Sequence, residues 1–296
     1  TMKYSKSIHI VAARRSPIGR LGGSLQSLNT ADLAAQVAAK VVDTGIAQQI
    51  GSVVFGQVLQ AGVGMNIARQ IALKIGIPQS TPGFTVNMVC GSGLKAVALG
   101  ADAIEQGEAS LALTGGVESM SRAPHYAREM RGGKKLGDVQ LVDSILADGL
   151  SDPLLKLGMG ELADRLAADF RISRAEQDRF ALQSQQRVAA AREAFKREIV
   201  PIRVGDRGKD DRVVEQDEHP RADTTFEKLQ SLKPAFKADG TVTAGNSSGI
   251  NDGAAVILLA NDQALKKNNL TARARVVGVC AVGCDPALFG IGPVGA

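Results

Sequence analysis

The sequence predicts an α/β protein, and two observations support this class. Short β-type runs alternate with helical patterns over the first 114 residues, and 44% of the 296 residues are hydrophobic while 22% are charged. Strands that alternate with helices are joined by right-handed crossovers, so we expect a mostly parallel sheet. The composition is that of an ordinary globular chain and excludes disorder, collagen and coiled coil.

The elements of the first 114 residues follow from local patterns. A β-type run at 7–13 is the first expected strand. Thr30 is positioned to cap a helix over 31–43, in which apolar residues recur near the helical period, and Gly45 is positioned to end it. The remaining segments, in order, are a strand at 52–59, a helix at 66–75, a strand at 84–88, a helix at 91–106 and a strand at 110–114.

The regular alternation stops after Gly115 and Gly116. Two helices are expected over 159–196, the second opened by Ser173 with Glu176 three residues on, which is a capping box. Further segments are strands at 199–204, 212–214, 241–243, 254–259 and 274–282 and a helix at 262–268. Residues of roughly 117–245 are therefore interpreted as an insertion between parts of one sheet domain.

The helix expected at 91–106 is apolar around nearly its whole circumference, interrupted only by Lys95, Asp102 and Glu105. A helix of this kind is buried on all sides. A single three-layer sandwich would expose its outer face to water, so we expect a further layer or a second subunit to cover it. The sequence thus predicts a homo-oligomer, a dimer or a tetramer.

Charge and composition restrict the partners. The formal charge is +5, with no Trp and 2 Tyr, so the stacking aromatics of nucleic-acid sites are missing. The positive charge is explained equally well by a small polyanionic partner, such as a phosphorylated cofactor, and by a solvated basic surface with no specific partner.

The longest apolar run, 254–260, is too short to span a membrane, and no secretory signal opens the sequence. The cysteines, Cys90, Cys280 and Cys284, are too few for a disulfide scaffold. We expect a cytoplasmic protein with no nucleic-acid or membrane partner.

Cys90 lies at a corner between an expected strand and the helix at 91–106. Such a corner places a thiol at a helix N-terminus, where free N–H groups and the helix dipole stabilise an anion. The small residues that follow, Gly91, Ser92 and Gly93, leave room for a substrate and for an oxyanion hole. From the corner alone, a buried core cysteine is an equal alternative, and it is the favoured interpretation for Cys280 and Cys284.

Four segments resemble, in order, the motifs of the thiolase family: 87–96 (NMVCGSGLKA), 115–121 (GGVESMS), 233–236 (KPAF) and 243–255 (TAGNSSGINDGAA). The resemblance extends from about Ile8 to Ala296. It implies the layered α-β-α-β-α architecture and an acyltransferase that forms or cleaves 3-ketoacyl-CoA through an acyl group on Cys90. Coenzyme A thioesters are then substrates, and no metal or additional cofactor is expected. The alternative is a non-catalytic acyl-CoA-binding or assembly subunit; a ketoacyl synthase fits less well, because it shares the corner cysteine but not the insertion.

The resemblance also implies residues that contact coenzyme A. By position, Arg221 approaches the nucleotide end, Ala244 and Ser248 contact the pantetheine arm, and Met159 and Phe236 line its tunnel. A solvated loop charge is the alternative for Arg221, and plain core is the alternative for Met159 and Phe236. The family often has His where this chain has Gly158, so the chain departs from the family pattern beside Met159.

The resemblance further implies three domain segments. Residues 1–116 with 246–270 form the N-terminal half, 117–245 form a loop domain that covers coenzyme A and builds oligomer contacts, and 271–296 begin the C-terminal half. The family's catalytic His, second Cys and an oxyanion-supporting Asn match segments beyond residue 296, so we expect most of the second half to be absent and turnover by this chain alone to be impaired. None of His9, His125 and His219 matches the Gly-His-Pro motif.

Overall fold

The computed structural model describes residues 2–206 and 209–296. These form two compact units. The sheet unit comprises the residues up to Pro124 with Lys196–Glu218 and Asn251–Cys280, and the helical unit comprises His125–Phe195, His219–Ile250 and Ala281–Ala296. Lys196–Glu218 therefore clusters with the sheet, although it lies within the segment 117–245 that the sequence predicts to be an insertion.

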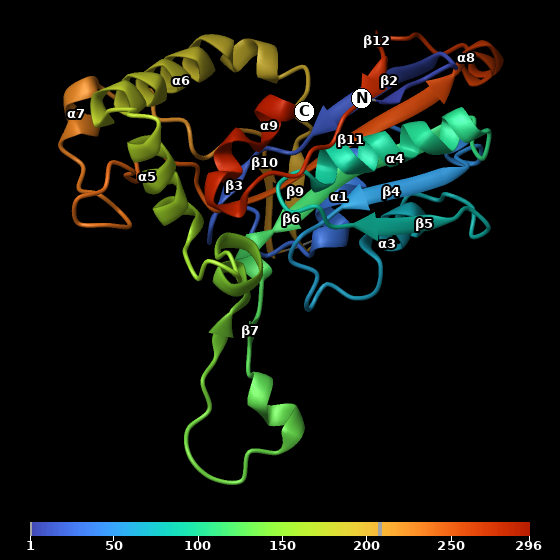
Figure 1. Cartoon of the computed structure of the whole chain (residues 1–296). Coiled ribbons are helices and arrows are strands. Elements are labelled where there is room, and N and C mark those ends of the chain that lie inside the picture. Colours follow the sequence, from blue (N-terminus) through green and yellow to red (C-terminus); the bar gives the residue numbers. More distant parts are fainter. Residues whose placement is uncertain (1, 207–208) are drawn as a thin grey trace. The chain divides into compact units, whose positions relative to one another are not determined.

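The sheet unit holds most of the strands (Figure 1). They are β1 (Met2–Lys3), β2 (Ile8–Arg15), β3 (Gly19–Arg20), β4 (Ser52–Gly56), β5 (Gly83–Val86), β6 (Leu111–Ser119), β9 (Ile202–Asp206), β10 (Lys209–Val214), β11 (Asn251–Asn261), β12 (Ala274–Arg275) and β13 (Gly278–Val279). Its helices are α1 (Thr30–Ala38), α2 (Thr44–Ala47), α3 (Ile67–Lys74), α4 (Ser92–Gln106) and α8 (Asp262–Asn268), with a 3-10 turn at Met120–Arg122.

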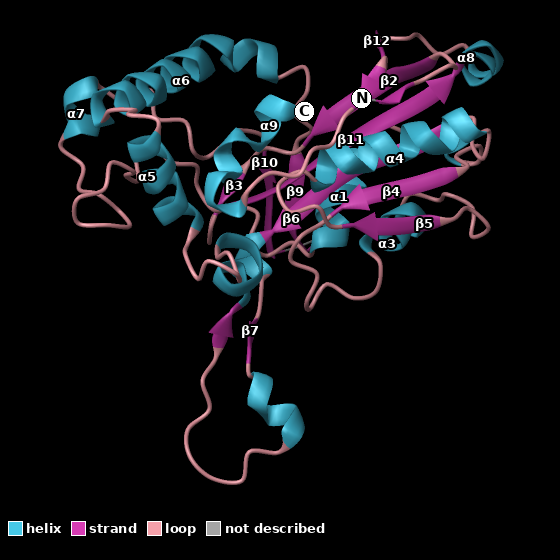
Figure 2. Ribbon diagram, viewed as in Figure 1, coloured by secondary structure: helices cyan, strands magenta, loops and turns pink. Residues whose placement is uncertain are grey.

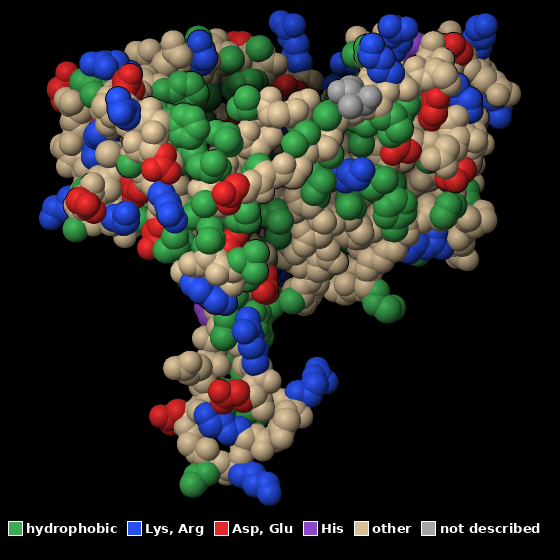
Figure 3. All heavy atoms as spheres, viewed as in Figure 1, with side chains coloured by type: hydrophobic (Ala, Val, Ile, Leu, Met, Phe, Trp, Pro, Cys, Tyr) green, Lys and Arg blue, Asp and Glu red, His purple; other side chains and the backbone are tan. Residues whose placement is uncertain are grey.

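The helical unit is built mainly from two helices, α5 (Met159–Asp169) and α6 (Arg174–Phe195). Its other elements are β7 (His125–Tyr126), β8 (Val142–Asp143), α7 (Phe226–Gln230), α9 (Gly292–Gly295), a π-helical turn at Ile145–Leu150 and 3-10 segments at Arg128–Gly132 and Pro286–Ile291. The segment between β7 and β8 exposes a group of basic side chains (Figure 3): Arg128, Arg131, Lys134 and Lys135. Among the described residues, no helix is long and apolar enough to cross a membrane.

The central sheet has the strand order β12-β2-β11-β6-β4-β5, with β3 also paired to β11. Strand β4 is parallel to β5 and β6, but β11 is antiparallel to both β6 and β2. The sheet is therefore mixed. The prediction of a mostly parallel sheet was wrong. The register explains this difference: Asp252 pairs with Ser119, so the chain leaves β6 and returns as β11 at the same end of the sheet. A return at the same end needs no crossover.

The two faces of the sheet carry different helices (Figure 2). On one face, Ala101 and Ile104 of α4 pack against Ala112 and Leu259. On the other, helices α1 and α3 form the larger cluster, which includes Leu113. Alternation along a strand produces this division. The α/β class predicted from the sequence is confirmed.

Several local expectations need correction. The first helix is capped by Asn29, whose side chain accepts from the Asp32 N–H, and it ends at Ala38 rather than at 43. Gly45 lies within α2 instead of ending a helix. The expected strand at 241–243 is only a bridge between Pro234 and Thr243, and 274–282 forms the short strands β12 and β13. The capping box at α6 is confirmed, since the Ser173 N–H donates to Glu176 Oε2 at 2.8 Å.

Helix α4 is buried over only part of its surface, whereas the sequence predicts burial on all sides. Its polar positions serve the N-terminal segment: the Tyr4 hydroxyl donates to Asp102 Oδ1 at 2.9 Å, and the backbone N–H of Ser5 donates to Glu105 Oε1 at 2.8 Å. Two of the three residues that interrupt the apolar surface, Asp102 and Glu105, therefore anchor a covering segment. At the other end of the helix, Leu94 is 80% exposed.

Candidate active site

Cys90 lies in the turn that joins β5 to α4. Its thiol is free and exposed, so Cys90 is not a core cysteine. The two residues before it are also open to solvent, with Met88 43% and Val89 51% exposed. Cys284 is exposed and Cys280 is partly buried, which corrects the expectation of a core position for Cys284.

Side-chain hydrogen bonds fix the conformation of this turn. Ser92 is 4% exposed, and its Oγ accepts from the Met88 N–H at 2.8 Å and donates to the Val89 carbonyl at 2.6 Å. Asn87 Oδ1 accepts from the Val89 N–H at 2.9 Å. Both backbone polar groups of Val89 are therefore held. Val89 has a φ of 48°, which is a strained conformation for a β-branched residue.

Two glycines of the sheet allow the start of α4 to lie directly on the strands. A Cβ on Gly56 of β4 would lie 2.5 Å from the Ser92 carbonyl carbon. A Cβ on Gly116 of β6 would lie 3.3 Å from the Cα of Gly93. Side chains at these positions would push the helix start away from the sheet, and the turn that holds Cys90 would move with it.

The N-terminus of α4 is open toward a ligand. Gly91 occupies the N-cap position, and no side chain accepts a hydrogen bond from the first turn. In the part of the chain described, the backbone N–H groups of Cys90 and Gly93 donate to no other protein group. Unsatisfied N–H groups together with the helix dipole favour a negative charge at this position. The arrangement can stabilise a thiolate and an oxyanion formed next to it.

Glu118 supports the neighbouring loop from the end of β6. Its carboxylate oxygens accept from the backbone N–H of Val58 at 2.8 Å and of Leu59 at 3.1 Å. Burial raises the pKa of the Glu118 carboxyl, while the two N–H donors act in the opposite direction. The Val58 carbonyl in turn accepts from Asn87 Nδ2 at a long 3.5 Å. Glu118 is therefore connected to the Cys90 turn indirectly, through the backbone of Val58.

Comparison with known proteins identifies the family to which this chain belongs. The family described as Thiolase, N-terminal domain, matches residues 8–263. The chain belongs to the thiolase family. It is 46% identical over 293 residues to an acetyl-CoA acetyltransferase of Chromobacterium violaceum, with 98% of this chain and 75% of the relative covered. It is 44% identical to human mitochondrial 3-ketoacyl-CoA thiolase, over 99% of this chain and 75% of that protein.

Solved thiolase structures share the fold. The crystal structure of human mitochondrial 3-ketoacyl-CoA thiolase in complex with CoA matches with a TM-score of 0.94 and 43% identity, covering 100% of this chain and 75% of that one. The crystal structure of the Bacillus anthracis acetyl-CoA acetyltransferase matches with a TM-score of 0.91 and 39% identity, covering 98% of this chain and 74% of that one. The predicted thiolase-like architecture and acyltransferase class are thereby confirmed.

The residues that the thiolase resemblance assigns to coenzyme A all lie in the helical unit. Ala244 and Ser248 are exposed on one loop, and Arg221 is exposed on another. The Arg221 N–H donates to Gln185 Oε1 of α6 at 2.8 Å, which ties that loop to the helix.

Phe236 contacts the first turn of α5, the helix that begins at Met159. The Phe236 ring lies over Gly160, where a Cβ would be 2.2 Å from the ring carbons. Phe236 is nevertheless 48% exposed, so it is not plain core. Gly158 caps α5 through its N–H, which donates to Glu161 Oε2 at 2.7 Å.

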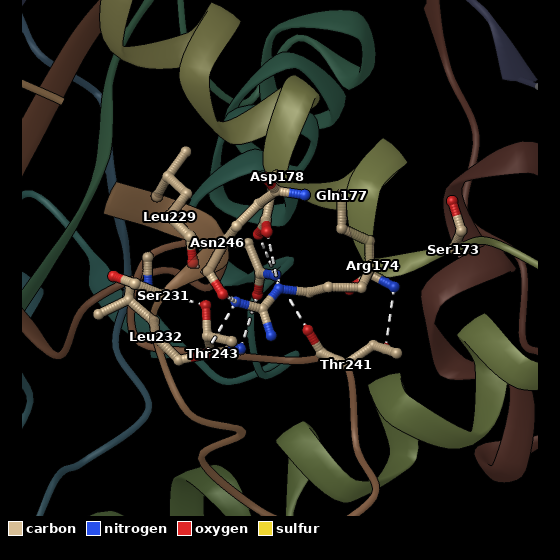
Figure 4. Close-up of polar contacts among 12 residues, drawn as sticks. Ser173, Arg174, Gln177, Asp178, Leu229, Ser231, Leu232, Thr241, Thr243 and Asn246 are labelled. Carbon is tan, nitrogen blue, oxygen red and sulfur yellow. Dashed lines mark hydrogen bonds and ion pairs between the residues drawn. The ribbon is translucent and has the colours of Figure 1, made fainter. Parts of the chain in front are cut away.

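A buried polar network holds the loop that carries Ala244 and Ser248 (Figure 4). Asp178 of α6 has a fully buried side chain, which pairs with Arg174 Nε at 2.7 Å and accepts from Asn246 Nδ2 at 3.0 Å. Asn246 Oδ1 accepts from the Thr243 N–H at 2.7 Å. Arg174 also donates to main-chain carbonyls at the end of and after α7, those of Leu229 and Leu232. One ion pair thus joins α6, α7 and the loop.

Sequence reasoning missed the supporting residues. Asn87, Ser92 and Glu118 all lie inside segments that resemble thiolase motifs, but their partners are backbone groups, which no side-chain pattern reveals. The i,i+4 spacing of Arg174 and Asp178 was a usable signal for an ion pair on α6. The residues described contain no group of three or more His, Cys, Asp or Glu side chains that could hold a metal ion.

Proposed function

We propose that Cys90 is the acyl-accepting nucleophile of this thiolase, which forms or cleaves 3-ketoacyl-CoA. The observation that carries the proposal is the exposed thiol at the uncapped N-terminus of α4. A thiol there has an anion-stabilising helix end, unsatisfied N–H groups and access to solvent.

The chemistry has two steps. The Cys90 sulfur attacks the thioester carbonyl carbon of an acyl-CoA, the bond from that carbon to the coenzyme A sulfur breaks, and the thiol proton ends on the released coenzyme A. The acyl group then passes to the α-carbon of acetyl-CoA, which loses a proton as the Cys90 thiol is restored. Thiolysis is the reverse sequence. We propose that the N–H groups of Cys90 and Gly93 stabilise the carbonyl oxygen as charge develops on it.

Coenzyme A is proposed to bind through Arg221, Ala244, Ser248, Met159 and Phe236. Arg221, Phe236, Ala244 and Ser248 are exposed, and Met159 at the start of α5 is half-buried, which supports this assignment. A guanidinium suits the phosphates of the nucleotide end, and the apolar pair at α5 suits the pantetheine arm. We further propose that coenzyme A thioesters are the substrates without an additional cofactor.

We propose a cytoplasmic homo-oligomer, a dimer or a tetramer. A group of exposed apolar side chains at the start of α4 and in the turn before it, Met88, Val89 and Leu94, supports a covering surface there. We also expect the polypeptide of these 296 residues to be acylated but to turn over slowly. None of its His residues lies in a Gly-His-Pro motif, and a positioned acid or base is worth about 10²–10⁴ in rate.

Selective alkylation tests the proposal. Iodoacetamide should modify Cys90 faster than Cys280 and Cys284, and acetyl-CoA should protect Cys90. Cys284 is the internal control, because it is also exposed. Equal labelling of Cys90 and Cys284 without protection would reject the assignment. Protection without any acyl adduct on Cys90 would favour the non-catalytic acyl-CoA-binding subunit.

A further inference from the structure

We propose that Asn87 is a positioning residue for Cys90: its side chain holds Val89 in the left-handed conformation that presents the thiol at the start of α4. The inference rests on the proposed function of Cys90 and adds a residue that acts through the backbone without touching the substrate.

The strain at Val89 requires an explanation. Its φ of 48° is unfavourable for any residue with a Cβ and especially for a β-branched one. Such conformations persist where the surroundings hold them, and they concentrate at functional sites. Val89 is 51% exposed, so core packing does not impose its conformation. Hydrogen bonds to its backbone are the remaining restraint.

The Ser92 N–H donates to the Val89 carbonyl at 3.1 Å. Two side chains supply the rest of that restraint, and they differ in their other contacts. Ser92 holds the Val89 carbonyl, but it is buried within α4, so its replacement would also disturb the helix. Asn87 lies between β5 and α4, is exposed, and holds the Val89 N–H at 2.9 Å. Its other contact, from Nδ2 to the Val58 carbonyl, is long at 3.5 Å. Replacing Asn87 therefore changes the turn with little effect on the fold.

The consequence concerns the direction of the thiol. If the Val89 N–H is released, Val89 can relax to a negative φ, and the peptide that leads into Cys90 rotates. The backbone of Cys90 then moves relative to the start of α4, and the sulfur moves with it. A displacement of about 1 Å at a reacting atom can cost about 100-fold in rate, so we expect Asn87→Ala to slow acylation by about 10-fold to 100-fold.

A rescue experiment separates positioning from a general structural effect. Glycine adopts positive φ without a Cβ penalty, so Val89→Gly should make the turn less dependent on Asn87. We expect acylation of Asn87→Ala by acetyl-CoA, followed by mass spectrometry on Cys90, to be slow. The double variant Asn87→Ala with Val89→Gly should regain most of the rate of Val89→Gly alone. Thermal unfolding checks that each variant is folded.

The outcomes are distinct. If the wild-type chain is never acylated at Cys90, the proposed function fails. If the wild-type chain is acylated and Asn87→Ala matches its rate, Asn87 has no positioning role. If Asn87→Ala is slow and Val89→Gly does not rescue it, Asn87 acts by some route other than the conformation of Val89, and the inference is overturned.

Discussion

Replacing Asp178 by Ala should destabilise the loop assigned to coenzyme A. The variant removes the fully buried carboxylate that joins α6 to Asn246. Arg174 keeps its main-chain carbonyl acceptors, Leu229 and Leu232, and Asn246 keeps the Thr241 carbonyl. Both nevertheless lose their contact with the charged acceptor that links them.

The magnitude follows from the two lost contacts. Hydrogen bonds that involve a charged group contribute about 1.5–3 kcal/mol each, and breaking a fully buried ion pair costs about 3–5 kcal/mol. The Arg174 side chain is 23% exposed, so water compensates part of its loss. We expect Asp178→Ala to lower the free energy of unfolding by about 3 kcal/mol.

Denaturant unfolding and hydrogen exchange measure this effect. The Thr243 amide, which donates to Asn246 Oδ1, should exchange faster in the variant. Coenzyme A binding should weaken, because Ala244 and Ser248 lie on the same loop. The matched control is Gln183→Ala, at an exposed position of the same helix, where a change within about 0.5 kcal/mol is expected. If Asp178→Ala unfolds and exchanges like the control, the network does not hold the loop.

Three further predictions concern single residues. Burial raises the pKa of Glu118 in the folded chain. Its contribution to the free energy of unfolding is therefore complete at a pH below the ordinary pKa of Glu, and it is lost as the pH rises through the raised pKa. In Glu118→Gln, the free energy of unfolding measured with denaturant should fall less steeply as the pH rises. The same pH profile as in the wild type would contradict this. Gly56→Ala places a Cβ 2.5 Å from the Ser92 carbonyl carbon, so it should cost about 1–3 kcal/mol and slow labelling of Cys90; wild-type stability and labelling would refute this. Gly160→Ala should displace the Phe236 ring and weaken coenzyme A binding in calorimetry, whereas unaltered affinity would remove Phe236 from the site.

The strand, turn and helix around Cys90 could be predicted because their signals are local. Apolar runs, the small residues after Cys90 and the helical period all lie within about 25 residues of sequence. The thiolase motifs were equally readable, since each is a continuous segment. The capping box formed by Ser173 and Glu176 was predicted correctly for the same reason.

The features that escaped prediction depend on distant partners. The antiparallel position of β11 follows from where the chain re-enters the sheet after the inserted segment, which no local pattern encodes. The outer face of α4 is covered by Tyr4 and Ser5, whose partners Asp102 and Glu105 read only as interruptions of an apolar helix. The roles of Asn87 and Ser92 depend on backbone groups and on the conformation of Val89.

Mass spectrometry of the chain after incubation with acetyl-CoA tests the central claim most directly. Proteolysis of the acid-quenched protein would locate any adduct among the cysteines, with Cys90→Ala as the negative control. The account predicts a stable acetyl group on Cys90 and none on Cys280 or Cys284. An unmodified Cys90, or acetylation that persists at the same level in Cys90→Ala, would contradict it.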